Sequence, residues 1–541
     1  MGFNTSSGRC RPFSGYFDCA AQHESGPSTL QGPGPKPGGE LQAARRNRND
    51  LPMRAAYHSA GPTRTILRRG LLIISLTAGP GFLATAQTPV ECRTRAGRLQ
   101  GLRDTSGLLL FKGVAYAAPP VGPGRFRPPQ PVPPWDGLRA ATAFGPRAPQ
   151  GGGTEVQGAE NCLTLNVWTP SLRAAEPKPV VVWVHGGGFT GGSGDDFPGQ
   201  NFARQDSIVA VSINYRLGSF GFLQLGNRLG PAYRAAGNAG VLDVVAALGW
   251  VQTNIAAFGG DPARVTVMGE SAGAKLISAV LAAPAADGLY QQVILESGGA
   301  QAVRDTTTAA TVTNRLLAAL GLRPDQAAQL LTLPTADIIR AQQQLTDGPK
   351  GLQLFGPVLD GVIIPEAPLA HLARPGRLSL RALLGTNRDE AGLFMGFWPA
   401  LQQPNPAVLD DLFGANAKQV WRAYKHARRR QPTDQAWLAA TTDYLYRLAT
   451  YRLAATLARV GQPVWLYRFD YQPPGGPGPL HAQELGYAWN ALAPRPDNYL
   501  PARPWPPKCT SAGCTSFRLA PRARSGPLTR LNGPKLWCST R

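Results

Sequence analysis

The sequence has few of the residues that bind metal ions. Its 541 residues include 6 His and 7 Cys. Only two of the cysteines, Cys92 and Cys162, lie in the central part of the chain, and no cysteine spacing there resembles a metal site. No metal site is therefore expected there, and the chemistry inferred below needs neither a metal nor an organic cofactor.

Acidic residues are scarce as well, since 33 Asp and Glu face 55 Lys and Arg and the net charge is +22. The two ends of the chain, residues 1–86 and 491–541, hold 14 of these net charges. The part between them has no basic stripe with interleaved aromatic residues, which argues against a nucleic-acid partner. The run Arg428–Arg430 predicts a solvated helix face.

Long hydrophobic runs are also missing. The apolar stretch around Leu71–Leu76 is interrupted by Gly79–Gly81 and is too short to span a bilayer. It follows the basic pair Arg68–Arg69 and precedes Ala84–Ala86, which is the layout of a secretory signal, although an ordinary buried helix is the alternative. We interpret residues 53–86 as a signal peptide and expect a secreted or periplasmic protein.

Residues 1–52 precede this segment and show no hydrophobic periodicity. They are rich in Gly, Pro, Ser, Arg and Asn. Because a secretory signal works at the N-terminus of a chain, we expect translation to begin at Met53. Residues 1–52 would then be a non-native or disordered extension.

Between residues 87 and 495, apolar β-type runs alternate with helical patterns. Helices are expected near Leu242–Ile255 and Ala272–Ala282. Continuous apolar strands separated by helices imply an α/β fold, with a large, mostly parallel central sheet and helices on both faces. The expected strands are Pro179–Val184, Ser207–Ile213, Val265–Met268, Val293–Glu296, Ala382–Gly385 and Val464–Phe469.

The most informative motif is Gly-x-Ser-x-Gly, from Gly269 to Gly273. A β-branched run precedes it and a small-residue helical pattern follows it. A strand that reverses sharply into a helix lifts the serine oxygen clear of the sheet, and small neighbours give the turn room. This context predicts a nucleophile elbow at Ser271, beside a helix N-terminus that favours developing negative charge.

Acyl transfer also needs donors for the oxyanion, and His185–Phe189 is the expected source. Its three glycines follow the apolar strand that ends at Val184, so the backbone N–H groups can turn toward a ligand. A plain glycine-rich turn or a phosphate cradle is the alternative. No Gly-Lys-Ser/Thr follows, so a phosphate-binding loop is not indicated.

The base is expected among three histidines after Ser271, because the order in α/β hydrolases is Ser, acid, His. His426 adjoins a basic run and is expected at the surface, and His371 lies in an apolar helical stretch where a core or helix-end role is favoured. His481 follows a Gly/Pro-rich turn past a predicted strand, where catalytic residues of open α/β sheets gather. The pattern His481-x-x-Glu484 lacks the further histidine of a zinc helix.

The acid is harder to assign from position. Asp360, Asp389 and Glu390 all follow apolar runs. Glu390 and Asp389 are about equally placed just past a predicted strand, and Asp360 ranks behind them.

These motifs together resemble those of the type-B carboxylesterases, which include bacterial para-nitrobenzyl-type esterases and cholinesterases. The resemblance runs from about Val90 to about Asn490. Phe258–Gly273 resembles the family's serine signature, and Glu160–Pro170 resembles its second signature with one departure. Ala115–Trp135, which is a proline-rich linker by composition, resembles an ordered N-terminal segment of the family.

The resemblance implies an α/β-hydrolase fold and a role for each reacting group, and it favours Glu390 over Asp389. The implied roles are Ser271 as nucleophile, His481 as base, Glu390 as acid, the backbone N–H groups of Gly187, Gly188 and Ala272 as oxyanion donors, and Ser297 as a residue that helps to hold the acid.

Three positions depart from the family pattern. Asn161 stands where the family has Asp, and Ala391 follows the acid where Gly is common. The usual disulfide partner of Cys162 is replaced by Ala148. The resemblance therefore leaves Cys162 either free or paired with Cys92.

The resemblance stops after about Pro504. Residues 498–541 hold eight Lys and Arg and no Asp or Glu. We expect residues 496–541 to be an aberrant tail, of the kind that a shifted reading frame produces.

The sequence as a whole predicts an exported serine hydrolase that cleaves small-molecule carboxylic esters through an acyl-enzyme intermediate. No stable membrane span and no nucleic-acid partner are expected, and the oligomeric state is left open. The alternatives are a catalytically silent, cholinesterase-like binding module and an inactive product of a corrupted gene.

Overall fold

A computed structural model describes residues 87–491, apart from 153–154, 377–378 and 477. The predicted extension 1–52, the predicted signal peptide 53–86 and the predicted tail 496–541 lie outside the described residues and stay predictions.

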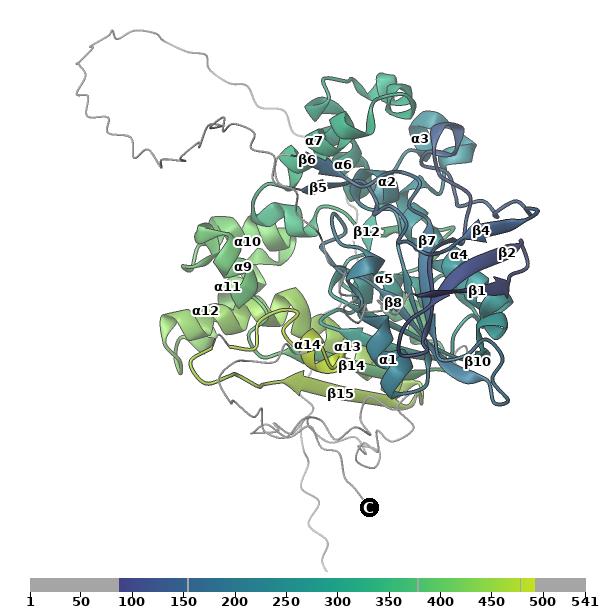
Figure 1. Cartoon of the computed structure of the whole chain (residues 1–541). Coiled ribbons are helices and arrows are strands. Elements are labelled where there is room, and N and C mark those ends of the chain that lie inside the picture. The colour runs from purple at the N-terminus through teal and green to yellow at the C-terminus, as the bar shows by residue number, and fades with distance from the viewer. Residues whose placement is uncertain (1–86, 153–154, 377–378, 477, 492–541) are drawn as a thin grey trace, which may run out of the picture. The chain divides into compact units, whose positions relative to one another are not determined.

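The centre of the described part is an 11-stranded sheet (Figure 1). Its strands follow the order β1-β2-β3-β7-β9-β8-β10-β11-β14-β15, and β4 pairs with β2. The strands are β1 (Thr88–Arg93), β2 (Arg98–Arg103), β3 (Leu109–Ala115), β4 (Leu138–Ala140), β7 (Thr164–Thr169), β8 (Lys178–Val184), β9 (Val209–Ile213), β10 (Gly260–Glu270), β11 (Gln292–Glu296), β14 (Arg381–Asn387) and β15 (Val464–Phe469).

Two short ribbons lie outside this sheet: β5 (Gln150–Gly152) with β6 (Glu155–Gln157), and β12 (Arg304–Asp305) with β13 (Val358–Leu359). In the large sheet, β9, β8, β10, β11, β14 and β15 pair in parallel. The mostly parallel α/β sheet expected from sequence is therefore confirmed, and each of the six expected strands has its counterpart here.

The N-terminal strands were not predicted. β1, β2, β3 and β7 pair antiparallel with one another, and β7 pairs antiparallel with β9. β1 and β2 alternate exposed and buried positions only partly. Strands near a sheet edge need no continuous apolar run, so their sequence signal is weak.

Helices cover both faces of the sheet. The described helices are α1 (Gly199–Gln205), α2 (Gly218–Phe222), α3 (Gly226–Leu229), α4 (Ala239–Asn254), α5 (Ala272–Val280), α6 (Thr306–Ala319), α7 (Thr335–Thr346), α8 (Pro368–Leu372), α9 (Gly392–Phe397), α10 (Pro406–Phe413), α11 (Ala417–Ala427), α12 (Thr433–Thr442), α13 (Leu448–Arg459) and α14 (Leu485–Ala488).

Strand β8 shows how the two layers arise. Its side chains alternate between the faces, so Val182 and Val184 join the apolar core that includes α4 and α5. Val181 and Trp183 join a smaller apolar cluster on the other face, with α1 and α14. Because both faces of β8 are buried, its sequence is a continuous apolar run.

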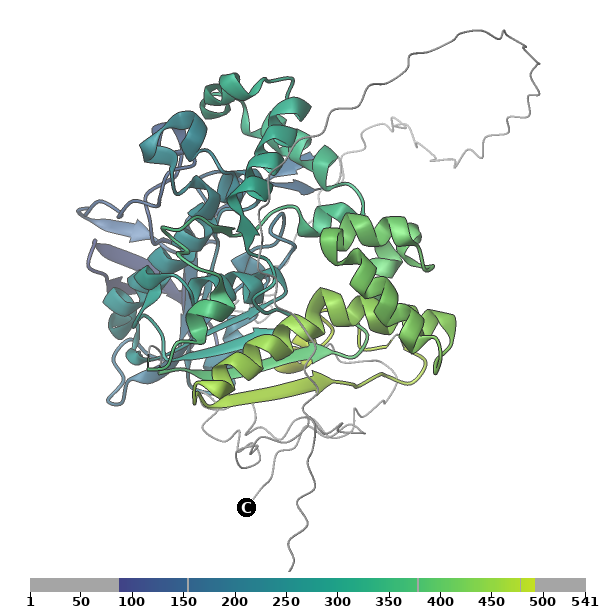
Figure 2. The ribbon, with the colours of Figure 1, turned by 180° about the vertical axis from the view of Figure 1, so that it is seen from behind.

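At the far end of the sheet, Figure 2 shows α13 running along β15, and the two elements are in contact.

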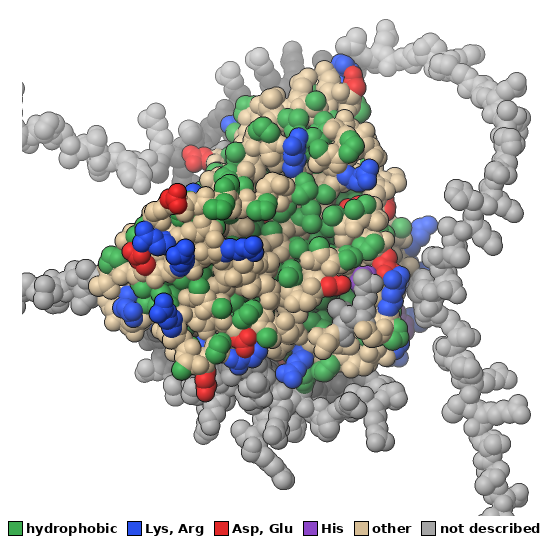
Figure 3. Space-filling view, turned by 90° about the vertical axis from the view of Figure 1, so that its right-hand side faces the viewer, with side chains coloured by type: hydrophobic (Ala, Val, Ile, Leu, Met, Phe, Trp, Pro, Cys, Tyr) green, Lys and Arg blue, Asp and Glu red, His purple; other side chains and the backbone are tan. Residues whose placement is uncertain are grey.

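The positive surface residues do not gather into a stripe on the face shown in Figure 3, where Lys and Arg are interspersed with Asp and Glu. Arg428–Arg430 are solvated, but they lie in the turn after α11 rather than on a helix face. The helical pattern predicted there ends at Ala427.

One described helical stretch, Pro231–Phe258, is long and apolar enough to cross a membrane by length and composition alone. Just over half of its most apolar window, 56%, is buried inside the protein. It includes α4, whose Val241, Val244 and Val251 belong to the main core. The apolar composition is therefore accounted for by packing against the sheet.

A buried ion pair joins the parallel sheet to α4. Arg216 follows β9, and its guanidinium donates to Asp243 at 2.6 and 2.8 Å. The side chains are 2% and 0% exposed. The same guanidinium donates to the carbonyl of Arg127 at 2.7 Å, so the pair also holds the proline-rich segment against the core.

We predict that Asp243→Ala lowers the free energy of unfolding by about 3–5 kcal/mol, because it leaves the buried Arg216 charge unpaired. Chemical denaturation monitored by fluorescence measures the change. Asp337→Ala is the control, since its ion pair with Arg340 is exposed and its loss should leave the midpoint nearly unchanged. Equal, small shifts in both variants would contradict the prediction.

Candidate active site

The turn at Ser271 joins strand β10 to helix α5. Ser271 has φ 53° and ψ −118°, a left-handed conformation that costs a non-glycine residue ~1–3 kcal/mol. Its N–H donates to Glu296 O at 2.9 Å, and its carbonyl accepts from Lys275 N at 2.9 Å. A Cβ at Gly269 would lie 2.8 Å from Val184 O, so glycine is required there. The strand-turn-helix predicted around this serine is confirmed.

The glycine-rich loop lies against this turn. A Cβ added to Gly186 would come within 3.3 Å of Ser271 Cβ. Gly187 and Gly188 have φ of 98° and 62°, and among the described residues their N–H groups donate no hydrogen bond. The N–H of Ala272 belongs to the first turn of α5, where helix N–H groups lack intrahelical partners. The role of these three N–H groups as oxyanion donors stays a prediction.

His481 and Glu390 form a short, buried contact. His481 Nδ1 lies 2.6 Å from Glu390 Oε2. The other carboxylate oxygen, Oε1, accepts from Asn387 N and from Ser297 Oγ, both at 2.7 Å. Glu390 is fully buried and His481 is 6% exposed. A carboxylate held by several donors keeps the imidazole in one orientation, with Nε2 directed away from it.

The competing acids have other partners. Asp389 pairs with Arg388 at 2.8 Å. Asp360 accepts backbone N–H groups from residues 362–364, which makes it a turn residue. Position in the sequence did not distinguish Asp389 from Glu390. Of the three candidate acids, the structure brings Glu390 to His481.

The second ring nitrogen of His481 contacts another carboxylate. His481 Nε2 lies 3.0 Å from Glu270 Oε1. Among the described residues no hydrogen bond joins Ser271 Oγ to His481. Catalytic hydrogen bonds of this kind often tighten only when substrate binds. The structure thus brings His481 and Glu390 together directly, and places Ser271 next to Glu270 at the same strand end.

Aromatic rings enclose the histidine. Tyr446 stacks on His481 with centroids 4.4 Å apart, and the Phe394 ring lies 5.3 Å away. Burial raises the pKa of Tyr446 well above its usual value, Glu390 and Glu270 add to the rise, and the Ser271 side chain opposes it. The tyrosine therefore stays neutral beside the histidine.

The remaining downstream histidines lie elsewhere. His371 is 1% exposed in α8, with Nδ1 3.1 Å from Glu366 Oε1. His426 is exposed near the end of α11. Both environments match the core or helix-end role and the surface role expected from sequence.

Several residues around the histidine were not assigned from sequence. Glu484 is 3% exposed, and burial raises its pKa to about 8, with Glu270 and Glu390 adding to the rise. Asn387 donates to it and so opposes the rise. Glu270 belongs to the serine motif, and Glu484 was weighed only as part of a zinc pattern. Burial and proximity, which a sequence does not display, separate them from ordinary surface acids.

Cys92 and Cys162 are both free and buried. Cys92 lies in β1 and Cys162 precedes β7, with β2 and β3 between those strands. Three strand spacings amount to roughly 14 Å, beyond the reach of a disulfide. Of the two alternatives left open by the sequence, pairing of Cys162 with Cys92 is therefore wrong, and the free thiol is confirmed.

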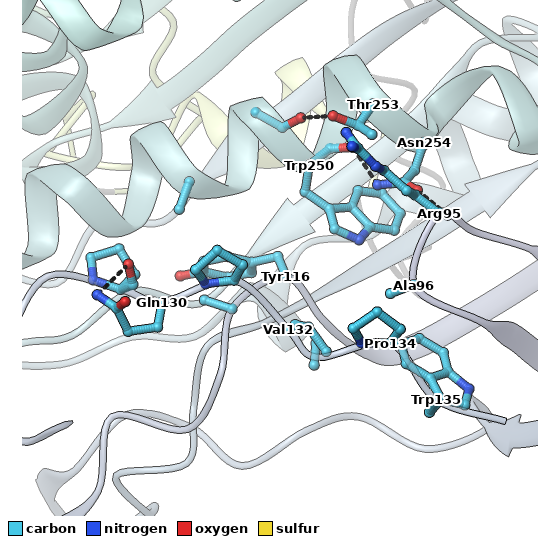
Figure 4. A pocket seen from close by; sticks show the side chains of 16 residues that line it. Arg95, Ala96, Tyr116, Gln130, Val132, Pro134, Trp135, Trp250, Thr253 and Asn254 are labelled. Carbon is cyan, nitrogen blue, oxygen red and sulfur yellow. Dashed lines mark hydrogen bonds between the residues drawn. The ribbon is translucent and has the colours of Figure 1, made fainter. Parts of the chain in front are cut away.

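A cavity of about 650 Å³ lies away from these residues (Figure 4). It is lined by the proline-rich segment on one side and by α4, including Trp250, on the other. Its lining contains no His, Cys, Asp or Glu. The described residues also hold no group of three or more such side chains that could bind a metal ion.

Comparison with known proteins gives a consistent result. The profile described as the carboxylesterase family matches residues 87–500. The para-nitrobenzyl esterase of Bacillus subtilis is 37% identical over 418 residues, covering 74% of this chain and 82% of the relative. The phenmedipham hydrolase of Pseudarthrobacter oxydans is 34% identical, covering 74% and 82%.

Solved structures agree. The crystal structure of the Geobacillus stearothermophilus carboxylesterase EST55 at pH 6.2 superimposes with a TM-score of 0.67 at 37% identity. The match covers 76% of this chain and 86% of that one. At this identity and coverage, the likeness extends beyond general fold.

Thiol chemistry tests the cysteine assignment. Burial raises the pKa of both Cys92 and Cys162 to about 12, so neither forms thiolate at pH 8. We predict that iodoacetamide leaves both unmodified in the folded protein and alkylates both after unfolding without reductant. Peptide mass spectrometry reads the outcome, and a peptide carrying a Cys92–Cys162 disulfide would contradict it.

Proposed function

Because the chain belongs to the carboxylesterase family, we propose that it hydrolyses carboxylic esters through Ser271, with His481 as the base and Glu390 as the acid. The chain is a carboxylic ester hydrolase with the α/β-hydrolase fold of its relatives. The residues and the covalent route are our proposal.

In the first step His481 takes the proton of Ser271, and Oγ attacks the ester carbonyl carbon. The carbonyl oxygen becomes negative and is received by the N–H groups of Gly187, Gly188 and Ala272. Each donor of such a hole stabilises the transition state by roughly 3 kcal/mol. The protonated His481 then gives its proton to the departing alcohol, and an acyl-enzyme remains.

In the second step water replaces the alcohol. His481 removes a proton from the water, which attacks the acyl carbon, and the acid is released as Ser271 recovers its proton. Glu390 orients the imidazole and stabilises the imidazolium that forms in each step.

One observation carries the proposal: the 2.6 Å contact between His481 Nδ1 and Glu390 Oε2, next to the strained turn at Ser271. The carboxylate has no exposed surface and takes two further hydrogen bonds. A buried acid held this firmly on a histidine, at the strand end where a helix begins, is the arrangement that a serine hydrolase needs.

We predict that Ser271→Ala reduces kcat for a para-nitrophenyl ester by at least about 10³-fold, because the covalent route is lost. A fluorophosphonate probe should label Ser271 of the unchanged protein, as located by mass spectrometry. Ser278→Ala is the control, since Ser278 is buried in the same helix and its hydroxyl donates to the carbonyl of Ala274, one turn earlier. Undiminished activity of Ser271→Ala would refute the proposed nucleophile. A silent binding module would show neither turnover nor labelling.

A second prediction separates the two neighbouring acids. Glu390→Gln keeps the shape but removes the charge that stabilises the imidazolium, so kcat should fall by about 10²–10⁴-fold. Asp389→Asn is the matched control and should keep kcat within about threefold, because Asp389 pairs with Arg388 rather than with His481. Steady-state kinetics on purified variants measures both, and the reverse ranking would assign the acid to Asp389.

A further inference from the structure

The helix that begins at the proposed nucleophile carries a buried lysine. Lys275 is the fourth residue of α5, and its N–H donates to Ser271 O. The residue is only 5% exposed. A lysine is almost never buried to this degree without a compensating charge, because the ammonium loses its hydration.

The lysine ammonium lies on the same aromatic ring that supports the histidine. Lys275 Nζ is 4.6 Å from the ring centroid of Tyr446, and that ring stacks on His481 at 4.4 Å. Burial lowers the pKa of Lys275 to about 8, while Glu270 and Glu390 oppose the fall. The two carboxylates that stabilise this ammonium are the ones that contact the two ring nitrogens of His481.

The surroundings of the histidine are strongly acidic. Four glutamates that are at most 5% exposed gather around it. Burial and the neighbouring carboxylates raise the pKa of Glu270 and of Glu484, so this cluster holds a proton above the usual pH range of a glutamate. The charged or titratable groups of the elements packed here are Glu270 from β10, Glu296 from β11, Arg304 from β12, Glu390 after β14, Tyr446 before α13, Tyr467 from β15, and His481 and Glu484 before α14.

We propose that Lys275 is a positioning residue whose ammonium offsets negative charge at Glu270 and Glu390, and so lowers the pH above which the site is active. This inference rests on the proposed function. The lysine acts through the two carboxylates and touches no reacting atom. Because the charges are coupled, its loss makes the cluster hold a proton to higher pH, whichever group carries that proton.

The test measures kcat/KM for a para-nitrophenyl ester as a function of pH. The quantity compared is the acid limb, the pH range in which kcat/KM falls as the solution becomes more acidic. Lys275→Met keeps the length of the side chain and removes its charge, so the limb should move upward by about 0.5 to 1.5 pH units. Activity should approach that of the unchanged protein above the shifted limb. Lys275→Arg keeps the charge, and its limb should stay within about 0.3 pH units.

Lys112→Met is the matched control, because Lys112 Nζ also lies over an aromatic ring, 4.4 Å from Phe144, but far from the histidine in the sheet order. It should leave the limb unmoved. If Lys275→Met does not accumulate as folded protein, Lys275→Gln takes its place, with the same upward shift expected.

Two outcomes overturn the inference while the proposed function stands. One is an unshifted or downward-shifted limb in Lys275→Met, and the other is a uniform loss of activity at every pH, which indicates packing alone. Ser271→Ala, assayed in parallel, shows whether the proposed function itself fails. If that variant keeps its activity, the pH profile does not report this triad, and the proposed function is wrong whatever Lys275→Met shows.

Discussion

The site depends on the register of the parallel strands. Strands β10, β11, β14 and β15 pair so that Glu270, Glu296, Gly385 and Tyr467 form one row across the sheet. Carboxyl ends of parallel strands meet at one edge, so the loops that follow them share a single rim. Ser271 is the residue after Glu270 and so lies just beyond that row. The other reacting groups come from the loops that follow the neighbouring strands. A slip of one residue in any pair would turn the row to the opposite face.

The same register explains why the site is acidic. Glu270 and Glu296 are neighbours in the row, and burial raises the pKa of each well above its usual value. Glu390 adds to the rise at Glu270, and Glu484 and Glu270 add to the rise at Glu296. Gly385 has no side chain, and the Tyr467 ring occupies the space beside it. Buried carboxylates are costly unless donors or cations compensate them. Ser297 and Asn387 are such donors for Glu390, and Lys275 is the nearby cation.

Much of this architecture could be predicted from the sequence. The inner strands are buried on both faces, so their apolar runs are continuous, and Pro179–Val184 and Val464–Phe469 predict β8 and β15 within one residue. The turn at Ser271 has a strict local requirement for small neighbours, which its motif displays. Such features are local in the sequence, and local rules therefore find them.

What the sequence did not provide depends on contacts between distant segments. Asp389 and Glu390 are adjacent, so their positions alone do not decide between them. The family resemblance favours Glu390, and the packing of the loop that carries His481 brings that residue to the histidine. Glu270 and Glu484 resemble any other acidic residues until the fold buries them. The outer antiparallel strands lack a continuous apolar run, and the cysteine pairing depended on a strand order that the residues alone do not display.

The ring that supports the histidine depends on a local irregularity. Tyr446 belongs to a π-helical turn, Asp443–Arg447, inserted between α12 and α13. The wider turn changes the direction of the side chains that follow, and such turns often occur at functional sites. Here it directs Tyr446 onto His481, while Arg447 donates to Arg388 O at 2.7 Å and ties the turn to the loop that carries the acid. One helical irregularity thus positions the surroundings of both the base and the acid, which explains how a helical segment outside the sheet contributes to a site built on strand ends.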